Sequence, residues 1–154
     1  MRMKNNLTGK ASIHINTTAA RVWDALTTPS IIKQYFFGTD VVSHWKIGSP
    51  IIFKGEWDGK KYEDRGTILD IIPKELFRYS YWSSMSGTED KPENYATVTY
   101  ELSGSANNTL LTVTQENIPD EKTKEHSQQN WNKVLTDLRN LLEKKGVKRE
   151  RAVM

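Results

Sequence analysis

Apolar and polar residues alternate at the start of the chain and then change to a helical spacing. Residues 7–15 place apolar side chains at every second position, which is typical of a half-buried strand. Residues 19–26 carry apolar side chains at positions i, i+3, i+4 and i+7 behind a threonine, so they predict a short amphipathic helix. Pro29 suits the first turn of a second short helix, and Gly38 suits its end.

The central part of the chain, residues 40–116, shows strand patterns throughout, with turn residues at intervals of about ten. Asp58-Gly59, between two alternating segments, predicts a hairpin turn. The polar, turn-rich segment 85–94 predicts a mobile loop. Regularly spaced strands with short turns between them favour a single antiparallel sheet.

The longest predicted element is a helix that begins near Pro119 and ends just before Gly146. Between Trp131 and Leu142 its apolar residues keep a period of 3.6, so this half is expected to pack on the core. Nearer the N-terminus the same face becomes polar, with Ser127 and Gln128, and must face water, a loop or a polar site. One strand, two short helices, five or six antiparallel strands and a long helix make an α+β chain.

Composition fits one ordinary globular domain. The chain has 154 residues, 36% of them hydrophobic, and no cysteine, so disulfides, thiolate metal sites and a cysteine nucleophile are excluded. Its formal charge is +3, but five basic residues and one acidic residue lie after position 143. Taking these from the 22 basic and 19 acidic residues leaves 17 and 18, a charge of −1. The basic surplus therefore belongs to a solvated tail, and no nucleic-acid partner is expected.

The sequence carries no targeting signal. Residues 1–10 lack the apolar run that a secretion signal requires, and no stretch approaches the ~18 apolar residues of a membrane span. The expected compartment is the cytoplasm.

Conventional catalytic machinery is also missing. No HExxH, GxSxG or phosphate-binding loop is present, and histidines and carboxylates never cluster at metal-ligand spacing. His14 and His44 lie opposite the apolar rows of their strands, and His126 is interpreted as a surface residue of the last helix. The segment Glu63-Asp64-Arg65 is interpreted as a solvated strand face. We therefore expect no metal and no cofactor, and an enzyme is less expected than a binding protein.

Five segments together match a known protein family. The pattern VWDALT followed by Pro and Ile, within ARVWDALTTPSIIKQYF at 20–36, is fairly specific. The other segments are GTILDIIP at 66–73, LFRYSYW at 76–82, TVTYELSG with TLLTVTQE around 97–116, and NWNKVLTDLRNLLE at 130–143. Over about residues 10–145 the chain resembles the homologues of the activator of the heat-shock protein 90 ATPase, a family of the START-like (SRPBCC) superfamily. Tyr35 stands where that family usually has Trp.

The resemblance implies a helix-grip fold, in which a curved antiparallel sheet of about six or seven strands wraps around a long C-terminal helix, with two short helices after the first strand. It also implies one START-like domain over residues 1–146, followed by a basic tail at 147–154. Many superfamily members bind apolar or aromatic ligands between sheet and helix. Two alternatives remain: a chaperone partner, as the family name implies, and a cyclase-like enzyme that acts in the same cavity.

Aromatic residues fall mostly on the predicted inner faces, where they either fill the core or line a ligand site. Inward tyrosines favour a site, because a buried hydroxyl needs a partner and adds polar groups to an apolar interior. We therefore expect a small hydrophobic or aromatic ligand, with the two short helices and the 85–94 loop as a lid. The oligomeric state is left open. The predicted ligand-binding residues are Trp23, Tyr35, Phe36, Trp45, Phe53, Trp57, Tyr79, Tyr81, Tyr100, Ser127, Gln128 and Trp131.

Overall fold

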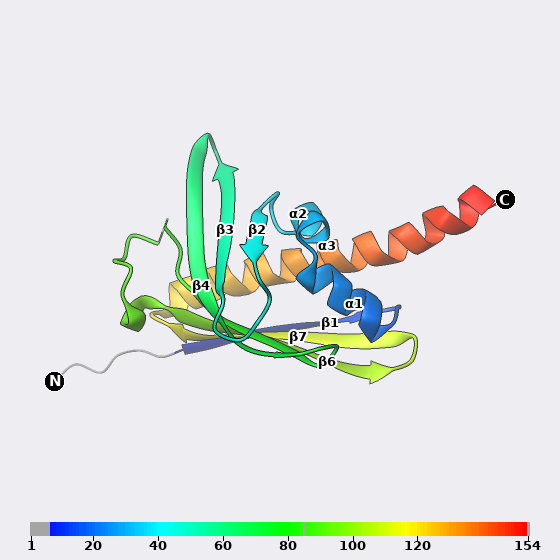
Figure 1. Ribbon diagram of the computed structural model, residues 1–154, viewed down its shortest axis with the longest axis horizontal. Coiled ribbons are helices and arrows are strands. Elements are labelled where there is room, and N and C mark those ends of the chain that lie inside the picture. Colours follow the sequence, from blue (N-terminus) through cyan, green and yellow to red (C-terminus); the bar gives the residue numbers. More distant parts are fainter. Residues whose placement is uncertain (1–6, 85, 154) are drawn as a thin grey trace.

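One curved sheet, two short helices and one long helix make up the protein (Figure 1). The structure is a computed structural model that describes residues 7–84 and 86–153; for Trp57, Ser105 and 144–153 it describes the backbone alone. The elements are β1 (Leu7–Ile15), α1 (Ala19–Thr27), α2 (Pro29–Tyr35), β2 (Asp40–Ser43), β3 (Pro50–Trp57), β4 (Lys60–Ile72), β5 (Leu76–Tyr81), the 3-10 turn η1 (Pro92–Asn94), β6 (Ala96–Ser105), β7 (Asn108–Ile118) and α3 (Glu121–Val153).

The described strands form a single antiparallel sheet in the order β1-β7-β6-β5-β4-β3-β2. This confirms the predicted fold class. β4 joins the two halves of the sheet, because its first part pairs with β3 and its last part, from Ile68, pairs with β5. The crossing needs glycine at position 66: a Cβ atom there would lie 1.6 Å from the backbone oxygen of Ser80. The β3–β4 hairpin therefore projects away from the layer formed by β1, β7 and β6 (Figure 1).

The two short helices form where the apolar spacing predicts them. The Thr18 hydroxyl accepts the backbone N–H of Arg21 at 3.2 Å and caps α1. Pro29 occupies the first turn of α2. The two helices are tied together by the Tyr35 hydroxyl, which donates to the Ala25 backbone oxygen at 2.7 Å.

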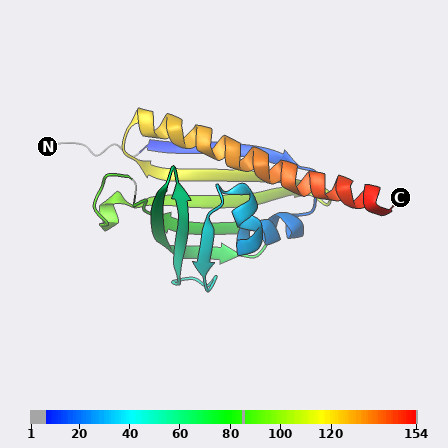
Figure 2. The same cartoon turned by 90° about the horizontal axis from the view of Figure 1, so that it is seen from above.

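Helix α3 lies along β1 on the inner side of the sheet (Figure 2). Its core face is formed by Val134, Leu135, Leu138 and Leu142, as the 3.6 period predicts. The predicted end before Gly146 is wrong, since the helix continues to Val153. A glycine inside a helix costs only about 1 kcal/mol relative to alanine, so it does not have to end one.

Candidate functional site

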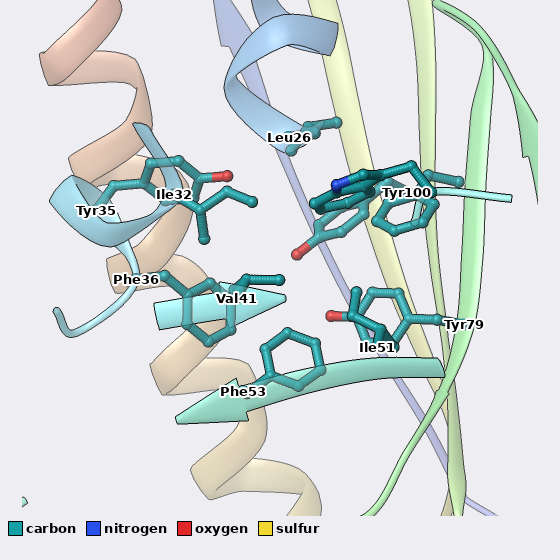
Figure 3. Close-up of a pocket in the computed structure, with 11 residues that line it drawn as sticks. Leu26, Ile32, Tyr35, Phe36, Val41, Ile51, Phe53, Tyr79 and Tyr100 are labelled. Carbon is teal, nitrogen blue, oxygen red and sulfur yellow. The ribbon is translucent and has the colours of Figure 1, made fainter. Parts of the chain in front are cut away.

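A small cavity lies between α1, α2 and the inner face of the sheet (Figure 3). Its volume is about 10 Å³, which is the lower limit for one water molecule. Strands of both halves of the sheet line it, because the bend in β4 brings β3 over β5 and β6. The lining residues are Leu26, Ile32, Tyr35, Phe36, Val41, Trp45, Ile51, Phe53, Phe77, Tyr79 and Tyr100.

Three tyrosine hydroxyls point into this cavity, from Tyr35, Tyr79 and Tyr100 (Figure 3). The Tyr35 hydroxyl donates to the Ala25 backbone oxygen, and the hydroxyls of Tyr79 and Tyr100 lie close enough to influence the pKa of each other. Burial is the main cause that raises the pKa of all three well above the usual value of a phenol. All three hydroxyls therefore stay protonated at neutral pH and can donate a hydrogen bond.

Five aromatic rings form a closed circuit across the interior. Ring centroids lie 6.3 Å apart for Phe36 and Phe53, 5.5 Å for Phe53 and Tyr79, and 6.2 Å for Tyr79 and Tyr100. Trp131 closes the circuit from α3, at 5.8 Å from Tyr100 and 5.9 Å from Phe36. Because the five rings come from β3, β5, β6, α3 and the residue that follows α2, they connect both halves of the sheet to the two helices.

The Trp131 side chain is fixed by a polar partner. Its indole Nε1–H donates to Oε1 of Gln115 on β7 at 2.8 Å. Trp23 lies outside the cavity lining and packs edge-on against Phe77, with centroids 6.4 Å apart. Trp45 does line the cavity and contacts Phe77 at 5.9 Å. The prediction for Trp57 falls on a side chain outside the part that the structure describes.

Two polar residues of α3 that were expected at the site lie elsewhere. Ser127 and Gln128 are half-buried and do not line the cavity. The Gln128 side chain donates to the Lys10 backbone oxygen at 3.3 Å and lies over Gly9 of β1. The polar end of the α3 inner face therefore covers the first strand.

The segment 85–94 was expected to form part of the lid, but its described residues contact β4 and the end of β5. Asp90 lies 3.6 Å from Arg65, and the Thr88 hydroxyl accepts from the Trp82 indole at 3.1 Å. None of the described residues of the segment lines the cavity.

Sequence reasoning missed Asp64. It was interpreted as part of a solvated strand face, yet it is only 6% exposed and lies on the inner face of β4. Its Oδ2 accepts the Tyr81 hydroxyl at 2.5 Å, and its Oδ1 accepts the Ser84 backbone N–H at 3.0 Å and the Ser84 hydroxyl at 3.3 Å. The two-residue period that places Asp64 in phase with Ile68 was the signal that could have found it.

Tyr81 links Asp64 to the aromatic circuit. Its ring packs edge-on against Phe53 at 5.4 Å and against Tyr79 at 6.5 Å. Burial and then the Asp64 charge raise the pKa of the Tyr81 hydroxyl well above its usual value, because ionising Tyr81 would place a second negative charge beside a carboxylate.

No group of three or more metal-ligating side chains occurs among the described residues. His14, His44 and His126 are exposed, and Nδ1 of His14 lies 3.0 Å from Oδ1 of Asn108 at the surface. None of the described helices combines the length and the apolar composition that a membrane crossing requires.

The curved seven-stranded sheet, closed on its inner side by a long C-terminal helix, defines a helix-grip domain of the START-like class. The chain belongs to the family described as Activator of Hsp90 ATPase homolog 1-like protein, whose model matches residues 16–143. The resemblance found in the sequence is thereby confirmed. A comparison with curated proteins gives no match.

Solved structures with the same fold cover nearly the whole chain. The solution structure of ChR145 from Cytophaga hutchinsonii is similar with a TM-score of 0.80 and 44% sequence identity, over 96% of this chain and 99% of that chain. The X-ray structure of MLL2253 from Mesorhizobium loti has a TM-score of 0.73 at 18% identity, over 90% and 98%. The solution structure of the Aha1 dimer from Colwellia psychrerythraea has a TM-score of 0.70 at 19% identity, over 89% and 96%. At such low identity the last two show the fold alone.

Proposed function

We propose that this protein binds a small hydrophobic or aromatic molecule in the cavity between the sheet, α1 and α2. One observation carries the proposal: three tyrosine hydroxyls, from Tyr35, Tyr79 and Tyr100, meet in an otherwise apolar interior that they do not fill completely. Apolar walls with a few convergent polar groups are the usual composition of a small-molecule site.

A structural core would not need these hydroxyls. Burying a hydroxyl costs free energy unless it is hydrogen-bonded, and phenylalanine fills almost the same volume without that cost. The hydroxyls of Tyr79 and Tyr100 interact with each other, so one polar atom of a ligand placed beside them can form a hydrogen bond with either hydroxyl. The interior is therefore suited to an aromatic molecule with a hydrogen-bonding substituent.

A cavity of about 10 Å³ is too small for an organic molecule, so binding requires one wall to move. The wall formed by α2 and the β2–β3 connection is suited to this movement. Phe37, just after α2, and Trp45, just after β2, both have positive φ values, 56° and 60°. Such backbone conformations cost about 1–3 kcal/mol for residues other than glycine. Displacing α2 and Trp45 would release this strain.

Titration with the uncharged fluorescent probe N-phenyl-1-naphthylamine tests the proposal. We expect saturable binding of one probe per chain and changes in the amide and indole NMR signals of Trp131, Tyr79 and their neighbours. Exposed residues of the outer sheet face, such as Thr67, serve as the internal control and should not shift. Unsaturable binding, or shifts spread over the outer face, would contradict a ligand site in the interior.

The family description favours one alternative function, stimulation of a chaperone ATPase. This alternative needs an exposed contact surface and does not involve the cavity. Adding the purified protein to a bacterial 90-kDa heat-shock chaperone and measuring its ATPase rate separates the two functions. A rise in rate that is the same with and without probe in the cavity would support a chaperone role that does not involve the cavity.

A further inference from the structure

In the part of the chain that the structure describes, the interior holds one carboxylate and no basic side chain. Among the described residues, Asp64 is the only carboxylate or basic side chain in the buried class. No lysine or arginine of the described chain forms an ion pair with it, and none lines the cavity. A largely buried carboxylate is stabilised by a partner of opposite charge.

Among the described residues, three donors reach the Asp64 carboxylate, all of them uncharged: the Tyr81 hydroxyl and the backbone N–H and hydroxyl of Ser84. A carboxylate offers about four lone-pair positions, so the three donors of the described residues do not occupy all of them. Asp64 also lies directly opposite Phe53 in the pairing of β3 with β4, and Phe53 lines the cavity. Asp64 thus lies beside the cavity wall, because it pairs with Phe53 and accepts from Tyr81, whose ring packs against Phe53 at 5.4 Å.

Those aromatic side chains favour cations as well. The faces of aromatic rings carry negative electrostatic potential, and sites that recognise organic ammonium ions are built from several such rings around one position. The circuit of Phe36, Phe53, Tyr79, Tyr100 and Trp131 supplies five rings, and Tyr81 adds a sixth beside the carboxylate. An anionic ligand would meet the Asp64 charge and no basic side chain.

From this combination we infer that the ligand of the cavity is an organic cation, an aromatic amine whose ring lies among Phe53, Tyr79 and Tyr100 and whose ammonium group is balanced by Asp64. The inference rests on the proposed function, because it assigns the charge of the ligand that this function binds. Asp64 is then a specificity-determining residue of the site.

Three naphthalene compounds that differ mainly in charge test the inference on the unaltered protein: 1-naphthylmethylamine, 1-naphthylmethanol and 1-naphthoate, titrated at pH 7 by calorimetry. We expect the amine to bind at least about tenfold more tightly than the alcohol, as one charge-assisted hydrogen bond provides, and the carboxylate to bind most weakly. If amine and alcohol bind equally, the inference is overturned while the proposed function stands. If neither binds, both are overturned.

Two variants test whether Asp64 causes the preference for the amine. Asp64→Asn keeps the size of the side chain and an acceptor for Tyr81 but removes the charge. In this variant we expect the amine to lose its advantage, while the affinity for the alcohol stays within about threefold of the original. Glu63→Gln is the matched control, since Glu63 is the neighbouring carboxylate on the exposed face and pairs with Arg65. An amine preference that survives in a folded Asp64→Asn protein, or that disappears in Glu63→Gln, would overturn the assignment to Asp64; if Asp64→Asn does not fold, the charge series alone decides.

Discussion

Single hydroxyl groups distinguish this interior from an ordinary hydrophobic core. Tyr79 and Tyr100 are almost fully buried, and their hydroxyls interact with each other. Removing one hydroxyl of such a pair lowers stability, because the other hydroxyl stays buried without a partner. Removing both hydroxyls costs much less, because two apolar rings of nearly the same shape remain. The pair therefore predicts strongly non-additive effects of substitution.

Tyr79→Phe should lower the free energy of unfolding by about 1–2 kcal/mol, because the Tyr100 hydroxyl loses its partner in a buried site. Adding Tyr100→Phe should recover most of this loss. Urea unfolding of the two single variants and the double variant measures the coupling. Effects that add up in the double variant would show that the two hydroxyls do not depend on each other.

Ionisation of the buried tyrosines predicts how stability depends on pH. The pKa values of Tyr35, Tyr79, Tyr81 and Tyr100 are all raised, chiefly by burial, and that of Tyr95 is raised to about 12. Above pH 10 the unfolded chain loses these protons while the folded chain keeps them, so the stability present below pH 10 falls as pH rises.

In a base titration followed at 295 nm, the three buried tyrosines, Tyr35, Tyr79 and Tyr100, should ionise only together with unfolding, seen as a simultaneous loss of the far-UV circular dichroism signal. This measurement needs no variant of the protein, because the titration of free tyrosine supplies the reference curve. Ionisation of all six tyrosines near pH 10 in a protein that stays folded would contradict the buried positions.

At the scale of elements, strand β4 decides the shape of the site. It is paired first with β3 and then with β5, and at its bend Gly66 lies against the backbone of Ser80. This bend places Phe53 of β3 over Tyr79 of β5, so the cavity exists only if β4 can make the crossing.

Gly66→Ala should therefore destabilise the protein by more than about 3 kcal/mol, because the new methyl group would overlap a main-chain oxygen that cannot rotate away. Thr67→Ala, one position further on the exposed face, is the control and should change stability by less than about 0.5 kcal/mol. Thermal unfolding of both variants measures the difference. Equal melting temperatures would mean that β4 does not cross so closely to β5.

At the same scale, the sequence predicts elements well and their mutual positions poorly. Alternation and capping are local, so β1, the two short helices and the Asp58-Gly59 turn could be recognised from it. The burial of Asp64 and the docking of Gln128 on β1 depend on which segments the β4 bend and α3 bring together. Gly146 shows the same limit, because the low helix propensity of a single glycine does not determine where α3 ends.

For the molecule as a whole, the question is how a nearly filled interior accommodates a ligand. The candidate residues predicted from the sequence include six of the eleven that line the cavity, yet the volume of about 10 Å³ depends on the fit of all their side chains and is not encoded in any pattern. If the cavity is closed without ligand, the free energy needed to open it weakens the apparent affinity for every ligand. Lowering that cost by substitution should raise the apparent affinity.

Ile51→Ala provides this test. Ile51 lines the cavity and is only 1% exposed, so its truncation should leave space for a ring while costing about 2–4 kcal/mol of stability. We expect the affinity for N-phenyl-1-naphthylamine to rise several-fold, and bound probe to recover part of the lost melting temperature because it binds the folded state alone. Ile52→Ala, the half-buried neighbour on the opposite face of β3, should leave probe affinity unchanged. If both variants bind the probe as the original protein does, Ile51 does not border the ligand and the site lies elsewhere in the fold.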